Sequence, residues 1–369
     1  MSRIMRLNDR LNFFLVSRYR SEIYGIAALW IVFLHEISFQ GLGDNISNRF
    51  LRLPIQLLRE GDVGVDVFLF LSGVSLYFAL AKKPTMGRYI LRRLDRVLIA
   101  VFIIYGTRWI IQAVYYRQDW HLLAMEFSLT QFWLIGRNDG TWYISLLIPL
   151  YILYPSIHGI LFAKNRRLWI GSWAVVLIGF SILLYSLVHY ANLDYFNDVE
   201  NALRRIPTFL LGCAFGKAVY EKRKGSALLW GAAVVSCIGY LVFKHYSTLQ
   251  GNTYWRLIYV PAGLGFSYMF ALIFYLFDIS NCKLLRGLSM FFNFLGEFSL
   301  ELYLIHLALI TITNLFGIPS TNSAALIWIV ISIVGAWGIS KVAAHLSNKI
   351  EQVAFANETD SPSYTSCIG

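Results

Sequence analysis

The feature that most constrains this chain is a series of long apolar runs. Ten such runs can be drawn, at about residues 22–39, 63–81, 97–116, 141–162, 168–190, 203–220, 226–244, 256–277, 290–316 and 324–346. A span needs about 20 mostly apolar residues, and in lipid only helices and closed barrels satisfy their own backbone polar groups. Because the runs are far too long for barrel strands, we expect an all-α polytopic membrane protein with about ten transmembrane helices.

The charged residues indicate how the chain lies in the membrane. Only 14% of the residues are charged, against about 25% in a typical soluble protein. The net charge of +11 comes from basic residues at the ends of apolar runs, so we expect no nucleic-acid partner. With a cytoplasmic N-terminus, 22 of the 32 Lys and Arg residues fall on the cytoplasmic side and nine outside. This bias predicts that both termini are cytoplasmic.

The connections between the runs are too short to hold a soluble domain. We therefore expect one membrane-embedded domain over residues 1–350, followed by a polar and disordered tail over residues 351–369. The chain is expected in the cell membrane, which in a bacterium is the cytoplasmic membrane. Any active site must then be built between helices.

A histidine and two aspartates are candidates for chemistry inside the membrane. His35 lies in the outer half of the first run, where an ionisable side chain is costly and is therefore a functional candidate. The structural alternative for His35 is a packing histidine bonded to a neighbouring helix. Imidazole transfers protons near neutral pH. Asp62 and Asp66 share one helix face at a similar depth, so Asp66 is expected to orient His35. A cap at the helix start is the structural alternative for Asp62.

Basic residues follow the second run in the stretch RYILRRLDR. Arg93 and Arg96 are three residues apart and share a helix face. Guanidinium groups match phosphate geometry, which suits a cytosolic donor such as a coenzyme A thioester. The alternative is that these arginines only set the orientation in the membrane.

Two further runs carry polar and aromatic residues. Trp142 and Tyr143 open the fourth run, either as interface aromatics or as the lining of a sugar or acyl site. In the ninth run Tyr303 and His306 share one face with Ser299, whereas Glu301 lies on the opposite face with Glu297. Polar groups on both sides predict that protein encloses this helix. A hydrogen-bonded structural role is favoured for His306 over direct catalysis.

Several common catalytic motifs are absent from the sequence. It has no Walker loop, no HExxH, no GxSxG and no Cys/His metal cluster, so we expect no metal cofactor.

Glycines Gly61, Gly64 and Gly73 along the second run predict close helix packing there.

Short motifs in a fixed order resemble the acyltransferase 3 family of integral membrane acyltransferases. The motifs are IYGIAALWIVFLH, GDVGVDVFLFLSG, RYILRRLDR, TWYISLLIPLYILYP, RRIPTFLLGCAFG and LGEFSLELYLIH, and they cover nearly the whole chain. The resemblance implies that His35 is the catalytic histidine and that Arg93 and Arg96 are functional arginines of the inner loop. One departure is Tyr24, where the family commonly has a basic residue. Arg20, one turn earlier, is the candidate replacement.

The resemblance implies an acyl-CoA-dependent O-acyltransferase. It would move an acyl group, usually acetyl, from cytosolic acyl-CoA to a hydroxyl of a cell-surface or secreted carbohydrate or glycolipid. His35 would act as a general base or form a transient acyl-imidazole. Two other classes remain open from the residues alone: a proton-coupled transporter or flippase of glycolipid intermediates, and a glycan polymerase. The oligomeric state also stays open, a homo-oligomer included.

Overall fold

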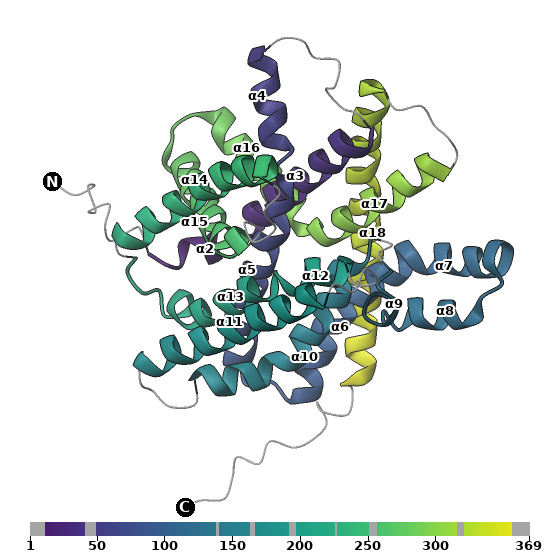
Figure 1. Cartoon of the computed structure of the whole chain (residues 1–369), viewed down its shortest axis with the longest axis horizontal. Helices are drawn as coiled ribbons and strands as arrows, with labels where there is room; N and C mark the ends of the chain where they lie inside the picture. The colour runs from purple at the N-terminus through teal and green to yellow at the C-terminus, as the bar shows by residue number, and fades with distance from the viewer. Residues whose placement is uncertain are drawn as a thin grey trace, which may run out of the picture.

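A computed structural model describes residues 12–40, 49–137, 140–162, 167–191, 197–225, 227–250, 257–315 and 321–355. Within these ranges the chain is helical, and all ten apolar runs form helices (Figure 1). The helices over the runs are α3 (Arg20–Gln40), α5 (Gly64–Ala81), α6 (Met86–Val101) continued by η2 (Phe102–Gly106), α7 (Thr107–Ile111) and η3 (Gln112–Arg117), α10 (Trp142–Phe162), α11 (Arg167–Tyr190), α13 (Ile206–Tyr220), α14 (Ala227–Gln250), α15 (Tyr259–Ile279), α16 (Lys283–Glu297) with α17 (Ser299–Leu315), and α18 (Asn322–Ala354).

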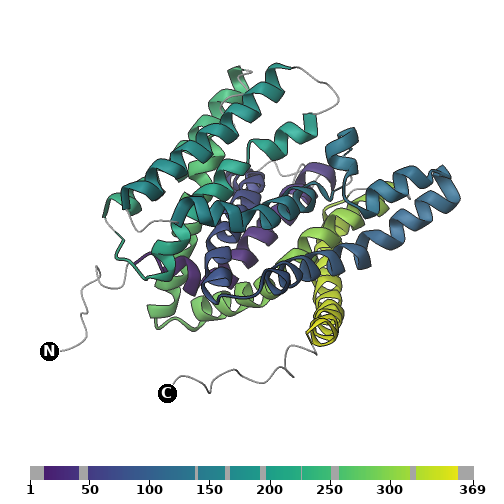
Figure 2. The same ribbon diagram turned by 90° about the horizontal axis from the view of Figure 1, so that it is seen from below.

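Short helices precede the first long helix or occupy the connections between the long ones. They are α2 (Leu15–Arg18), α4 (Arg49–Leu58), η1 (Gly61–Val63), α8 (Trp120–Phe127), α9 (Gln131–Ile135) and α12 (Asn197–Leu203). In Figures 1 and 2, α7 and α8 form a pair that projects from the rest of the molecule. The predicted tail begins inside a helix, because α18 continues to Ala354. The rest of that tail, from residue 356, lies outside the described residues, as do the arginines before residue 12.

The helices confirm an all-α architecture of the polytopic membrane class. Eight described helices are long and apolar enough to cross a membrane, or nine if the bent pair α16–α17 counts as one span. The remaining predicted run, 203–220, forms α13, which has 15 residues and packs along α5. The sidedness of the termini stays a prediction.

Helix α5 lies at the centre of the bundle and α14 at its edge. Of the 18-residue apolar stretch that includes α5, 78% is buried inside the protein, and the helix contacts α3, α10, α13 and α15. In α14 the buried share is 11%, and large apolar side chains such as Val235 and Phe243 are exposed. Apolar side chains on outer helices are what lipid-facing surfaces require.

Glycines allow the helices around α5 and α3 to touch through their backbones. A Cβ on Gly61, Gly64 or Gly73 would lie 2.2, 2.9 or 2.4 Å from a carbonyl oxygen of a neighbouring helix, which confirms the predicted close packing. The same occurs where α16 crosses α3, since a Cβ on Gly296 would lie 1.8 Å from the Ser21 carbonyl oxygen. Real Cβ atoms do not approach so closely, so these crossings require glycine.

Two features differ from the simple arrangement of spans and loops. The ninth run is broken, since α16 and α17 meet at an angle of 74° around Phe298. The stretch with Arg93 and Arg96 is helical, because Met86 to Tyr115 forms one long helix. The arginines therefore lie on a rigid helix, and the break in α16–α17 lies beside them.

Candidate active site

Two histidines from distant parts of the chain form a hydrogen-bonded pair. His35 lies on α3 and His306 on α17, and His35 Nδ1 is 2.9 Å from His306 Nε2. The two rings stack with centroids 5.1 Å apart. His306 is fully buried and His35 is half-buried. His306 is therefore held in position by the helices packed around it.

A backbone carbonyl determines the direction of this hydrogen bond. His306 Nδ1 lies 2.9 Å from the Leu302 carbonyl oxygen, which can only accept. With neutral rings, the His306 proton is therefore on Nδ1, and its Nε2 must accept from His35 Nδ1–H. The other nitrogen of His35, Nε2, then carries a lone pair. In this arrangement His35 Nε2 is the nitrogen of the pair that can accept a hydrogen bond or a proton.

A polar cavity of about 470 Å³ lies between α3, α5, α6, α10 and the α16–α17 break. This volume is within the range of small-molecule sites. Tyr143 and Tyr303 line the cavity with their ring centroids 5.4 Å apart. The Tyr303 ring also meets the His306 ring edge-on at 5.8 Å. One aromatic side chain thus lies between the cavity and the histidine pair.

Arginines line another part of the same cavity. Arg93 and Arg96 come from α6 and Arg20 from α3, and Tyr24 is part of the same wall. Arg96 Nη2 donates to the Glu297 carbonyl oxygen at 3.1 Å, which ties α6 to the end of α16. The structure therefore places Arg20 beside Arg93 and Arg96, where it adds the charge that Tyr24 lacks.

The carboxylate of Asp66 has partners other than His35. Arg205 donates to one oxygen of Asp66, and Thr208 Oγ1 donates to the other at 3.1 Å. Arg205 and Asp66 are both buried, so the ion pair joins α5 to the start of α13. The hydrogen bond to His35 that the sequence assigned to Asp66 is made by His306. That prediction was wrong because α17, far away in sequence, supplies the neighbour.

Asp62 also belongs to a network between helices. Its carboxylate accepts from Lys244 Nζ at 2.9 Å, from the Tyr240 hydroxyl at 2.7 Å and from the Tyr259 hydroxyl. Lys244 also pairs with Glu60 at 2.6 Å. This network attaches α14 and α15 to the start of α5. Asp62 does not occupy the N-cap position of α5, which is Val63, and its carboxylate accepts from side chains of α14 and α15 instead.

The remaining candidates lie around these features. Trp142 is stacked by the Arg205 guanidinium at 5.5 Å from its ring centre, whereas Tyr143 lines the main cavity. Glu301 is 2% exposed and lines a second, smaller cavity. The prediction that protein encloses this helix on both sides is confirmed, because Ser299 and Tyr303 face the main cavity.

Two polar residues near the site were not singled out from the sequence. Glu36 follows His35 directly and is 1% exposed, and its Oε2 has no hydrogen-bond partner among the described residues. Arg205 is the partner of Asp66. Both are ionisable residues in or beside an apolar run, which is the signal that could have found them. Among the described residues, no group of His, Cys, Asp or Glu could hold a metal ion.

Comparison with known proteins assigns the chain to a family of acyltransferases. Residues 25–341 match the family model Acyl_transf_3, described as an acyltransferase domain, and the match includes His35, Arg93, Arg96 and His306. The chain is 24% identical over 308 residues to "Putative acetyltransferase ORF330" of Acidianus two-tailed virus, covering 81% of this chain and 84% of the viral protein. No solved structure matches the chain significantly. The family match over most of its length shows that this multi-pass membrane protein is an acyltransferase of the acyltransferase 3 family.

Proposed function

We propose that this acyltransferase transfers an acyl group, most simply acetyl, from acyl-CoA to a hydroxyl of a cell-surface or secreted carbohydrate or glycolipid. It would do so in the cell membrane, which in a bacterium is the cytoplasmic membrane. The observation that carries the proposal is the His35–His306 pair, which leaves a free lone pair on His35 Nε2. The family supports acyl transfer over the transporter, flippase and polymerase alternatives.

The proposed donor is an acyl-CoA because the main cavity combines phosphate-binding chemistry with a wall, at Tyr303, that contacts the histidine pair. Arg20, Arg93 and Arg96 line it and offer forked donors to phosphate groups. Tyr143 and Tyr303 line the part that adjoins His306. The diphosphate of the donor would bind the arginines, and the acyl-pantetheine arm would extend between the tyrosines.

In the proposed reaction, His35 Nε2 removes the proton from the acceptor hydroxyl. The hydroxyl oxygen attacks the thioester carbonyl carbon, and the carbon–sulfur bond then breaks. The departing thiolate of coenzyme A receives the proton back from His35, so the histidine ends as it began. His306 acts as a positioning residue, because it holds the His35 proton on Nδ1 throughout. The same Nε2 would be the nucleophile if an acyl-imidazole forms instead.

The test is acyl transfer by purified His35→Ala. We expect release of free coenzyme A from acetyl-CoA to fall by at least about 100-fold, which is the lower end of what a positioned general base contributes. His345→Ala is the matched control, since His345 is an exposed histidine on α18. Wild-type turnover by His35→Ala would refute the mechanism.

The acceptor class is tested separately in cells. Deleting the gene should lower the mass of a surface or secreted glycan by one acyl group for each modified sugar, and restoring it should return that mass. A transporter or flippase would instead alter the amount of exported glycan, and a polymerase would alter its chain length. Unchanged acyl content in every glycan and glycolipid fraction would refute a carbohydrate acceptor.

A further inference from the structure

A second polar cavity adjoins the main one. It has a volume of about 230 Å³ and lies between α6, the α16–α17 break and α18. Arg96 and Glu297 line both cavities, so the second cavity lies directly beside the arginines of the first. The proposed function assigns nothing to this space.

An unsatisfied carboxylate indicates that the second cavity is built for a ligand. Glu301 lines it and is 2% exposed, and its Oε2 has no hydrogen-bond partner among the described residues. A buried polar group without a partner is costly. A ligand with an N–H or O–H donor would remove that cost, so we expect a donor to face Glu301.

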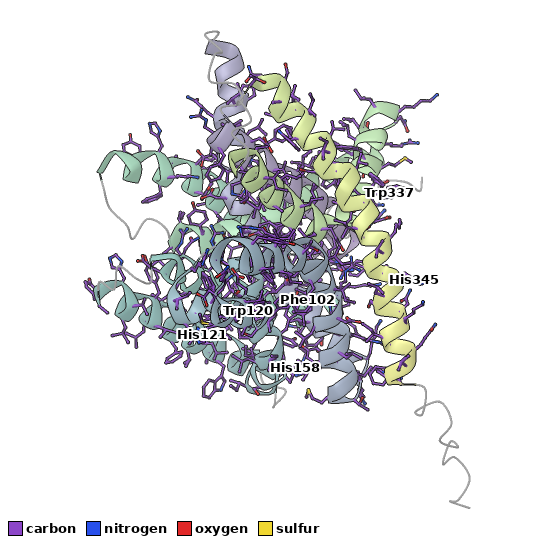
Figure 3. All side chains as sticks on the ribbon, turned by 90° about the vertical axis from the view of Figure 1, so that its right-hand side faces the viewer. Phe102, Trp120, His121, His158, Trp337 and His345 are labelled. Atoms are coloured by element: carbon purple, nitrogen blue, oxygen red, sulfur yellow. The ribbon has the colours of Figure 1, made fainter. Side chains whose placement is uncertain are left out.

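Helix α18 contributes complementary chemistry to the lining of this cavity. Lys341 and Asn348 of α18 line the cavity, bringing an ammonium and a carboxamide. Figure 3 shows α18 along one edge of the molecule, with Trp337 and His345 labelled one helical turn on either side of Lys341. Ser347 donates to Asp95 at 2.6 Å and so attaches this part of α18 to α6. The ligand that fits these walls carries an anionic group for Lys341 and an amino group for Glu301.

We propose that the second cavity binds the nucleotide end of the acyl-CoA donor. The amino-bearing base would face Glu301 and Asn348, because a carboxylate accepts from its N–H groups and a carboxamide can pair with its edge. The ribose 3′-phosphate would face Lys341. Arg96, on the wall that both cavities share, would receive the diphosphate that joins the nucleotide to the pantetheine arm. This inference rests on the proposed acyl-CoA donor.

The 3′-phosphate provides the sharpest test. Binding of coenzyme A and of 3′-dephospho-coenzyme A to the purified full chain is measured by calorimetry in detergent. We expect wild type to bind coenzyme A about tenfold more tightly, because the dephospho form lacks the charge-assisted contact to the exposed Lys341. Lys341→Ala should weaken coenzyme A binding about tenfold and leave the binding of the dephospho form unchanged. Lys349→Ala, an exposed lysine on the same helix, is the matched control.

A second variant separates the base from the phosphate. Glu301→Gln should weaken both ligands by a similar factor of about three to ten, because both carry the base. Adenosine 3′,5′-bisphosphate should compete with coenzyme A in wild type, and this competition should weaken in Lys341→Ala. Unchanged thermal unfolding of each variant shows that it is folded.

The outcomes separate this inference from the proposed function. If wild type binds both coenzymes equally and Lys341→Ala changes the binding of neither, the second cavity does not hold the nucleotide. The proposal that acyl-CoA is the donor would be unaffected by this result. Equal weakening of both coenzymes by Lys341→Ala would also overturn the assignment of the 3′-phosphate. If wild type binds no coenzyme A, the donor itself is wrong, and this inference fails with it.

Discussion

The pairing of His35 with His306 predicts how the reaction responds to changes at a residue that touches no substrate. Replacing His306 by Leu removes the acceptor of the His35 Nδ1–H bond and leaves an apolar side chain in a fully buried position. His35 can then turn, or carry its proton on Nε2. Either change removes the lone pair that should face the acceptor hydroxyl.

The size of the effect follows from the hydrogen bond that is lost. A buried donor left without its partner costs about 1–3 kcal/mol. At about 1.4 kcal/mol for each factor of ten, this corresponds to a fall in kcat of roughly 5- to 150-fold. The KM for acetyl-CoA should stay unchanged, since the arginines that would bind its phosphates line the main cavity and His306 does not. His306→Gln should restore most of kcat, because its amide oxygen can accept in place of Nε2.

The assay is the initial rate of coenzyme A release by purified protein in nanodiscs over a range of acetyl-CoA concentrations. Thermal unfolding is measured in parallel, so that a folding defect is recognised. Two results would refute the reasoning: His306→Leu as active as wild type, or Leu and Gln equally impaired while both fold. The first result would show that His35 needs no hydrogen-bond acceptor at position 306. The second would show that hydrogen-bonding ability is irrelevant at this position.

Two further predictions follow from the cavity and the helix crossings. The double variant Arg93→Ala/Arg96→Ala should raise the KM for acetyl-CoA about tenfold or more with a smaller effect on kcat, because the phosphate contacts of a partly exposed site are lost. Lys82→Ala is the control. An unchanged KM in the double variant would show that the two arginines only set the orientation of the chain in the membrane. Gly296→Ala should destabilise the protein by about 1–3 kcal/mol, since its Cβ would lie 1.8 Å from a backbone oxygen of α3. Gly338→Ala, with open space around its Cβ, should leave the melting temperature in detergent nearly unchanged, and equal melting temperatures for the two variants would contradict the close crossing.

Much of the architecture could be predicted from the sequence because each helix is a local property of its run. Lipid leaves a backbone no alternative partners, so about 20 apolar residues in succession must form a helix wherever they pack. The glycines beside Asp62 and Asp66 predicted close crossings, and those crossings are present. The polar stripes on both faces of the ninth run predicted an enclosed helix. These inferences require only helical periodicity and the fact that lipid surrounds the helices.

The bend between α16 and α17 could not be foreseen. The run 290–316 is apolar enough to read as one straight span, and the 74° angle depends on what packs beside it. Gly296 allows α16 to touch α3, and Arg96 donates to the carbonyl of Glu297 where α16 ends. These contacts join positions about 200 or more residues apart, and no local pattern contains them.

By itself the sequence determined the membrane setting and the helices. It also made His35 a candidate, because an ionisable side chain stands out in an apolar run. Only the tertiary structure decided the partner of that histidine. Asp66 has the right depth and helical phase, but Arg205 and Thr208 take its carboxylate, and α17 brings His306 to His35 instead. The physical reason is that helical periodicity gives the face of a side chain, whereas its hydrogen-bond partner depends on which helix packs against that face.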